Sequence, residues 1–246
     1  MMMKTQNVIF YVLLAIFFSS CDEIFKSYSD EDGLKAALVQ GTNKAVSILS
    51  QEDGYFKDQA VKILLPEEAQ SAIKVLNTLS HLGIPGVSEL GDNITLSMNR
   101  AAEAAATKAT PIFTSAITNM TFADATNILW GADTAATQYL RTNTSSELIA
   151  QFQPEIDPFL DMKLVGTEST NSLWEKFTNI NNQAANLPVV GSSLKPLNPS
   201  LSEHVTTQAI NGLFKKVANE EIAIRTDPLA RTSEILRSVF GKLDKE

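Results

Sequence analysis

The sequence predicts an all-α protein, a single helical domain of roughly eight or nine helices around one long central helix. Apolar residues recur through most of the chain at the spacing of amphipathic helices. No βαβ alternation and no hairpin signal occurs. An alanine-rich stretch, residues 93–120, is long enough to form the helix on which the others pack.

This central stretch carries only three charged residues, Arg100, Glu103 and Lys108. Its opposite face is polar with few charges, whereas a solvated face usually holds many. We therefore expect a helix covered on most sides, about 40 Å long at about 1.5 Å per residue. A kink is expected near Thr107, because Pro111 removes a backbone donor. The apolar face consists of Ile94, Met98, Ala101, Ala105, Ala109, Ile112 and Ala116.

Arg100 and Glu103 are three residues apart and therefore neighbours on one face of this helix. The favoured interpretation is a structural ion pair that ties this helix to another helix. The alternative is that Arg100 recognises an anionic ligand, with Asn99 and Glu103 orienting it. Arginine suits either role, because its guanidinium stays charged when it is partly buried.

Two helices are expected before the central stretch. Apolar residues recur at helical spacing over residues 34–49 and end before a turn at 51–54. Residues 61–65 are β-like in composition, but a single short strand has no partner, so we expect an extended connector. Pro66 and the two glutamates after it open the next helix, because acidic residues favour the positive end of the helix dipole. Glycine and proline at 83–86 end that helix.

Caps mark the helices after the central stretch. Thr121 and Asp124 predict an N-cap, and Asp133 is expected to cap the helix that follows. Residues 144–147, Thr-Ser-Ser-Glu, match a capping box and predict a new helix start, interrupted later by Pro154 and Pro158.

Three further segments complete the domain. Apolar spacing predicts a helix over 173–184, and the Pro- and Gly-rich residues 187–200 predict a loop. A helix is expected from Val205 to about Arg225, ended by Asp-Pro at 227–228. A last helix closes the domain before Gly241.

The N-terminus has the pattern of a secretory signal. Lys4 precedes an apolar run at residues 8–18, which is too short for a membrane span of about 20 residues. Small residues at 19–20 and then Cys21 resemble a bacterial lipobox, although Phe18 stands where an aliphatic residue is usual. We expect a signal peptide at 1–20, a lipidated tether at 21–32 and the helical domain at 33–243.

Cys21 is the only cysteine, so it has no disulfide partner. We expect acyl chains such as palmitate on Cys21, which anchor the protein durably to a membrane without a transmembrane helix. The expected location is the cell envelope, at the outer membrane, with the periplasmic or surface face left open. The acidic pair at 22–23 resembles the surface-export tag of Bacteroidetes lipoproteins.

The net charge of −8 argues against nucleic acid as a partner, because the chain has no basic cluster. Charge also argues against peripheral binding to anionic lipid. The membrane, reached through lipid on Cys21, is therefore the one partner that the sequence predicts. Whether a protein or a small molecule binds as well is left open.

Motifs for catalysis, metals or cofactors were sought without success. His81 and His204 lie in no metal-binding motif, and residues 191–193 lack the second glycine of a nucleophile elbow. We therefore expect no cofactor, no metal and no catalytic residue, and the chain is interpreted as a non-enzyme rather than an enzyme.

Three more polar residues join the candidates. Asp133 is most simply a cap, Tyr139 a core aromatic residue, and Arg141 a cation at a helix C-terminus. If the later helices fold back on the central one, these residues could converge with Arg100 and Glu103 in one cluster. We state this convergence as a hypothesis.

Several runs of the chain resemble one bacterial family. Residues 97–105, SMNRAAEAA, are similar to the domain of unknown function family 4197, and the likeness extends from Gly33 to Gly241. Further matching runs lie at 111–113, 120–125, 135–141, 213–214 and 227–232. The resemblance implies a short helical envelope or secreted protein without an assigned activity, and it adds no catalytic residue.

Three functional interpretations follow. The preferred one is a lipid-anchored, non-catalytic helical module that binds a partner or has a structural role. The second is a hydrolase or transferase of envelope substrates that uses Glu103 or Asp133 as acid or base beside Arg100. The third is a carrier of an apolar molecule, which requires a large cavity between the alanine-lined helices.

Overall fold

The computed structural model describes residues 28–78, 88–163, 167–188, 193–198 and 200–244. In these ranges the chain forms helices joined by turns and loops, and its one β residue is the isolated bridge at Glu168. The predicted all-α fold is confirmed. The α-helices are α2 (Asp30–Leu49), α3 (Glu67–Thr78), α4 (Ser88–Ala105), α5 (Ala109–Thr118), α6 (Phe122–Leu129), α7 (Ala135–Asp161), α8 (Thr170–Ala185), α9 (Ser202–Thr226) and α10 (Glu234–Phe240).

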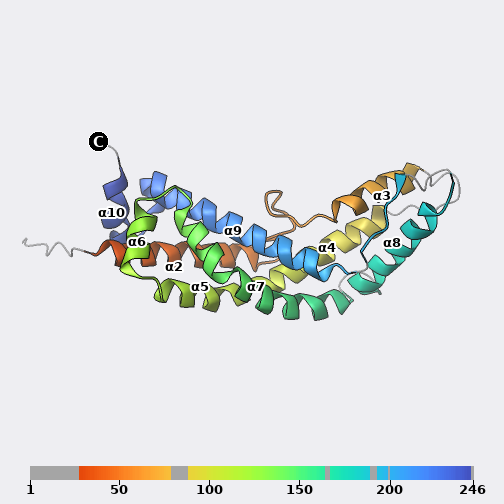
Figure 1. Ribbon diagram of the computed structural model, residues 1–246, viewed down its shortest axis with the longest axis horizontal. Coiled ribbons are helices and arrows are strands. Elements are labelled where there is room, and N and C mark those ends of the chain that lie inside the picture. Colours follow the sequence, from red (N-terminus) through yellow and green to blue (C-terminus); the bar gives the residue numbers. More distant parts are fainter. Residues whose placement is uncertain (1–27, 79–87, 164–166, 189–192, 199, 245–246) are drawn as a thin grey trace, which may run out of the picture.

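The helices form an elongated bundle (Figure 1). α7 packs on α9, α4 and α5, while α2 packs on α9, α5, α6 and α10. The start of α2, together with α6 and α10, lies at one end of the molecule, and α3 and α8 lie at the other (Figure 1). Among the helices described, none has the length and apolar character needed to cross a membrane.

The central stretch forms α4 and α5, with the 3-10 turn η3 (Ala106–Lys108) between them. This break confirms the kink predicted near Thr107. The expected cover on most sides holds for α4 but is wrong for α5, where Thr114 and Thr118 are exposed. Their hydroxyls donate to main-chain carbonyls four residues earlier, both at 2.8 Å, so this outer face is polar without charge. The fully buried alanines of this stretch are Ala101, Ala102, Ala105, Ala106 and Ala109.

α7 is one helix of 27 residues where the sequence predicted two. The capping box expected at 144–147 is wrong. Thr144 is buried and its hydroxyl donates to the Leu140 carbonyl at 2.7 Å, while Ser145 donates to the Arg141 carbonyl at 2.6 Å. Hydroxyls that bond within their own helix do not cap a new one. The helix also continues through Pro154 and Pro158.

α2 begins at Asp30, inside the segment expected to be tether. The Ser29 hydroxyl accepts a hydrogen bond from the Asp32 N–H, and three acidic residues in the first turn favour the helix dipole. The extended connector at 61–65 and the start of α3 after Pro66 are confirmed. The predicted signal peptide and Cys21 lie outside the described residues.

Candidate functional site

A loop without helix, residues 50–66, crosses α4 and is bound there by the Asn99 side chain. Asn99 is 0% exposed. Its Oδ1 accepts from the Ile63 N–H at 2.8 Å, and its Nδ2 donates to the Ile63 carbonyl at 2.8 Å and to the Thr95 carbonyl at 2.7 Å. The Asn99 amide therefore pairs with the Ile63 main chain as a neighbouring strand would. This explains how the buried N–H and C=O groups of Ile63 are hydrogen-bonded without a sheet.

Glu103 binds the same loop one turn further along α4. Its carboxylate is 4% exposed, and Oε1 accepts from the N–H groups of Tyr55 and Phe56 at 3.1 and 3.2 Å. Oε2 accepts from Arg100 at 2.7 Å. A buried carboxylate needs this full set of partners to offset its desolvation.

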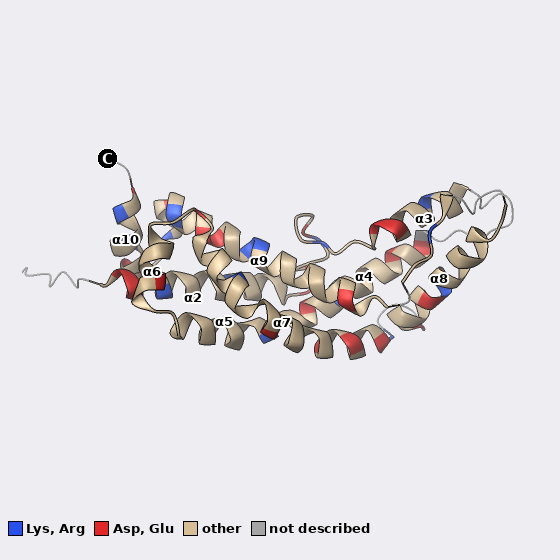
Figure 2. Cartoon of the chain, viewed as in Figure 1, with Lys and Arg blue, Asp and Glu red and all other residues tan. Residues whose placement is uncertain are grey.

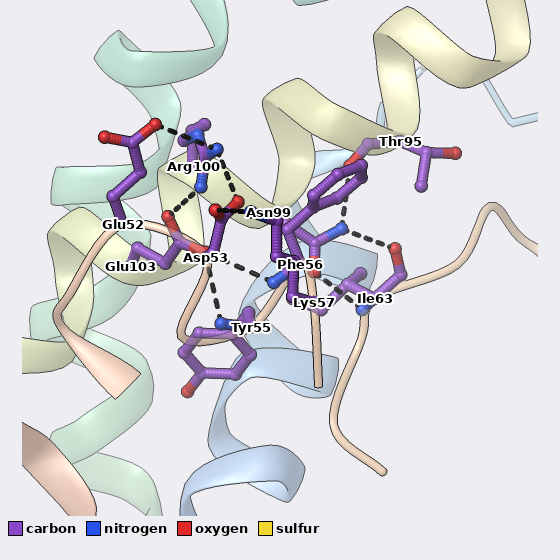
Figure 3. Close-up of polar contacts among 10 residues, drawn as sticks. All are labelled: Glu52, Asp53, Tyr55, Phe56, Lys57, Ile63, Thr95, Asn99, Arg100 and Glu103. Atoms are coloured by element: carbon purple, nitrogen blue, oxygen red, sulfur yellow. Dashed lines mark hydrogen bonds and ion pairs between the residues drawn. The ribbon is translucent and has the colours of Figure 1, made fainter. Parts of the chain in front are cut away.

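Arg100 connects Glu103 to the turn at the start of the loop. Its Nη2 donates to Asp53 at 2.8 Å and to Glu52 at 3.3 Å. Asp53 adopts a positive φ of 70° and also pairs with Lys57 at 2.8 Å. Hydrogen bonds from Lys57 and then Arg100 lower the pKa of the Asp53 carboxyl. Figure 3 shows these contacts, and we call Asn99, Arg100 and Glu103 the loop centre.

The other side of the loop is bound by α9. The Tyr55 hydroxyl is buried and donates to the Ala209 carbonyl at 2.8 Å. Burial, followed by the charge of Glu103, raises the pKa of this phenol strongly. Lys215 donates to the Ala60 carbonyl at 3.0 Å, and the His204 Nε2 lies 2.8 Å from the Leu64 carbonyl. The loop is therefore bound by both helices.

The remaining candidate residues have their contacts elsewhere. Asp133 is exposed and lines a groove beside Trp130 and Arg225. Tyr139 is half-buried, and burial followed by the charge of Asp124 raises its pKa. Among the described residues, no contact joins either of them to the loop centre.

Arg141 was expected at a helix C-terminus, but it lies in the first third of α7 (Ala135–Asp161). Its guanidinium sits 4.5 Å from the centre of the Phe214 ring and donates to Asn211 at 3.2 Å. Arg141 is thus held by α9, whereas Arg100 is held by the loop. The contacts of the described residues do not join the six candidates in one cluster.

A second buried set of charges was not predicted. Glu220 and Glu221 are adjacent on α9, but only Glu221 is buried. Its carboxylate is buried and accepts from the N–H groups of Ala136 and Thr137 at 2.9 and 2.8 Å. It also accepts from the Thr137 hydroxyl at 2.8 Å. Glu221 therefore caps α7, which corrects the expected role of Asp133, since the N-cap residue Thr134 makes no side-chain cap bond.

Arg225 binds the end of another helix. It donates to Glu221 at 3.1 Å and to the Ile128 and Leu129 carbonyls of α6 at 2.7 and 2.9 Å. An anion at a helix N-terminus and a cation at a helix C-terminus both complement the helix dipoles. The spacing of the two residues signalled an ion pair but not its burial.

Arg231 caps α9 itself. It donates to the carbonyls of Ile224 and Arg225, both at 2.9 Å, and its two terminal nitrogens bind Asp244 at 2.7 Å each. These bonds hold the segment after α9 against the C-terminal residues. We call Glu221, Arg225 and Arg231 the cap centre.

One apolar cavity between the described helices is small. An apolar cavity of about 20 Å³ lies between α2, α7, α9 and α10, which is room for about one water molecule. The fully buried alanines of α4 and α5 do not line it. These observations do not support the carrier interpretation, which needs a large cavity at those alanines.

An open groove of about 680 Å³ lies between the start of α3, α8, residues 195–198 and 200, and the start of α9. Trp174 forms part of its wall and donates to the Asn198 carbonyl at 2.8 Å. Glu68, Lys195, Glu203 and His204 supply charged or titratable groups. The groove has the volume of a small-molecule site and a mixed polar and apolar lining.

Metal chemistry has no candidate in the part of the chain that the structure describes, where no group of three or more His, Cys, Asp and Glu residues could hold an ion. His204 contacts a carbonyl, and His81 lies outside the described residues. Asn99, Glu103 and the three residues of the cap centre bind main-chain atoms, and Arg100 binds carboxylates. Both carboxylate oxygens of Glu103 have partners, the loop amides at Oε1 and Arg100 at Oε2.

Comparison with known families assigns the chain. The profile of the family described as a protein of unknown function (DUF4197) matches residues 26–241. The chain belongs to this family. The DUF4197 match covers α2 to α10, so the resemblance at 97–105 is confirmed and both polar centres lie within the family domain. No curated protein and no solved structure matches the chain.

Proposed function

We propose that this DUF4197 protein is a lipid-anchored protein of the cell envelope, at the outer membrane, with a non-catalytic binding or structural role. The observation that carries the non-catalytic part is the use of its buried charges. Glu103 binds two loop amides and Arg100, and Glu221 binds two helix amides and Arg225. Both carboxylates are therefore engaged in hydrogen bonds that hold the fold together.

The alternative of an envelope hydrolase or transferase has less support. It needs Glu103 or Asp133 as acid or base beside Arg100. Glu103 is buried and hydrogen-bonded to the loop amides and Arg100, and Asp133 is exposed in a different groove. A catalytic carboxyl is usually recognised by a raised pKa. The pKa of Asp53, the carboxyl bound to Arg100 in the loop, is lowered instead.

The groove beside Trp174 is the surface that we assign to a partner. It lies at the end of the bundle with α3 and α8, away from the start of α2 to which the anchor leads (Figure 1). Its nonhelical wall is held in place by α8, because Asn181 donates to the Lys195 carbonyl at 2.8 Å and Trp174 to that of Asn198. A wall fixed before binding reduces the ordering cost of association.

Anchoring is tested by Cys21→Ser in the full chain. The unchanged chain should incorporate labelled palmitate and sediment with membranes, and the variant should lose both properties, because Cys21 is the only thiol. Equal membrane association and labelling of the variant would overturn the anchor.

Binding is tested by native and then denaturing mass spectrometry of the chain from Cys21 onward, which contains every described residue. A small molecule that leaves on denaturation supports the binding role. Thr207→Trp should remove it, because Thr207 is exposed and lines the groove. Asn219→Trp, exposed on α9 outside the groove lining, is the matched control. An apoprotein of one mass favours a protein partner or a structural role, and catalytic turnover by the chain would contradict the proposal.

A further inference from the structure

The outward face of α6 is apolar or uncharged and carries two large aromatic side chains. Phe122 is 64% exposed and Trp130, the C-cap residue, is 58% exposed. Among the described residues, Phe122 and Trp130 are the aromatic side chains that stand out as large, hydrophobic and exposed. Ala123 and Asn127 are the other exposed residues of the helix. Tryptophan and phenylalanine favour the boundary between lipid headgroups and acyl chains.

The one charged residue of α6 is engaged locally. Asp124 forms a capping box with Thr121, in which its Oδ2 accepts from the Thr121 N–H at 3.1 Å and from the Thr121 hydroxyl at 2.7 Å. These bonds lower the pKa of the Asp124 carboxyl. The opposite side of α6 faces the core through Ala125, Ile128 and Leu129. The helix is therefore fixed to the bundle, and its exposed side chains are uncharged, with Asp133 as a charged neighbour of Trp130.

The position of α6 places it near the anchor. α6 packs against α2, and Lys35 on α2 lies 3.4 Å from the Thr118 carbonyl just before α6. Asp30, the first residue of α2, is nine residues beyond Cys21. Nine residues span at most about 30 Å when fully extended. α7 alone is about 40 Å long at about 1.5 Å per residue. An anchor at Cys21 therefore keeps this end of the bundle close to the bilayer.

Charges at this end of the bundle are mixed, since Asp30 pairs with Lys242 and Glu31 pairs with Lys35. Asp30, Glu31 and Asp32 form the first turn of α2, and Figure 2 shows the acidic start of that helix beside α6. Acidic side chains are repelled by anionic headgroups, so electrostatic attraction does not explain a contact here. Aromatic insertion into zwitterionic lipid does not need basic residues.

We propose that the outward face of α6 (Phe122, Ala123, Asn127 and Trp130) lies in the headgroup region of the bilayer that holds the anchor. This inference rests on the proposed lipidation of Cys21. The tether alone would leave the bundle free to rotate, whereas tether and α6 together give two points of attachment. The end with α3, α8 and the groove then points away from the lipid surface.

The test uses Trp130 as its own probe. The chain from Cys21 onward retains all described helices, and its single thiol is coupled to a maleimide lipid in phosphatidylcholine vesicles. Coupling through Cys21 makes this test independent of natural acylation, which the labelling of Cys21→Ser decides separately. Lipids brominated near the headgroup end of their acyl chains should quench the fluorescence and shift the emission to shorter wavelength. The other tryptophan, Trp174, is 1% exposed in the bundle and supplies a constant background.

Three variants complete the experiment. Trp130→Phe should abolish the quenching, and Phe122→Gln should reduce it. Ile149→Gln removes a side chain with 46% exposure on α7 and should leave the quenching unchanged. Equal emission from brominated and unbrominated vesicles overturns the proposal. Quenching that persists in Trp130→Phe, or that disappears in Ile149→Gln to the same extent as in Phe122→Gln, also overturns it.

Discussion

The loop centre and the cap centre use buried charge in the same way but in different surroundings. At the loop centre, Glu103 is buried while the Arg100 side chain is 22% exposed and reaches acidic groups at the surface. At the cap centre, Arg225 and Glu221 are both buried and bind the ends of two helices. Removing the partner of a charge costs more folding free energy when the charge is buried from solvent. The cap centre should therefore be more sensitive to substitution.

The largest expected effect is at Arg225. Arg225→Ala leaves the Glu221 carboxylate buried without its cation and leaves the last carbonyls of α6 without their donor. Removing one partner of a buried pair typically costs about 3–5 kcal/mol, so the free energy of unfolding should fall by about that amount. Urea denaturation measures it.

The control for Arg225→Ala is Lys44→Ala. Lys44 pairs with Glu220 at 2.7 Å, but its side chain is 57% exposed. Exposed pairs contribute about 0–1 kcal/mol, so this variant should unfold almost like the unchanged protein. Equal losses in the two variants would contradict the distinction between buried and exposed pairs of α9.

At the loop centre the expected effect is smaller. Asn99→Ala leaves the buried N–H and C=O groups of Ile63 unpaired, which should cost about 1–3 kcal/mol. Hydrogen exchange should show the Ile63 amide losing protection. Glu52→Gln is the control, because the Glu52 side chain is 82% exposed. If both variants exchange alike at Ile63, Asn99 does not hold the loop.

The sequence singled out Asn99, Arg100 and Glu103 but not the loop that they bind in place of the expected helix. It missed the cap centre for a physical reason. Arg100 and Glu103 stand almost alone in an alanine-rich stretch, so their charge required a partner. Glu221 and Arg225 stand among other charged residues at ordinary helical spacing, where a solvated pair is the usual outcome. Their partners are main-chain groups of α6 and α7, which no residue pattern encodes.

Patterns of neighbouring residues predicted much of the fold. They failed where a residue from a distant helix supplies the cap or the ion-pair partner. The capping box at Thr121 and the break near Thr107 follow from neighbouring residues, and both were predicted. The start of α7 is capped from α9, so the nearby Asp133 was a plausible but wrong choice. The partners of Arg100 in the loop also lie 47 and 48 residues away, and spacing within a helix does not reveal them.

Gly212 offers a test of the contact between α9 and the loop. A Cβ at this position would lie 2.8 Å from Tyr55 Cε1 and 3.2 Å from Val61 Cβ. Gly212→Ala should displace the Tyr55 ring and weaken its bond to Ala209, at a cost of about 1–3 kcal/mol for overpacking. Thermal denaturation measures the loss.

Gly241→Ala is the matched control for Gly212→Ala, because no atom lies within 4 Å of the added Cβ. It should be neutral or slightly stabilising, since alanine restricts the unfolded chain. A destabilisation by Gly241→Ala as large as that of Gly212→Ala would show that contact with Tyr55 is not the cause.

The smallest expected effect is at the exposed edge of the cap centre. Arg231 hydrogen bonds lower the pKa of the Asp244 carboxyl below its ordinary value of 3.8, although the Asp244 side chain is 47% exposed. A carboxyl whose pKa is lower in the folded state contributes stability above its unfolded pKa, and this is lost as pH falls through the folded value. Asp244→Asn should therefore lower Tm at neutral pH, and the difference from the unchanged protein should shrink below pH 3.8. Thermal denaturation across this range measures it, and a Tm difference independent of pH would show that the charge of Asp244 does not stabilise the fold.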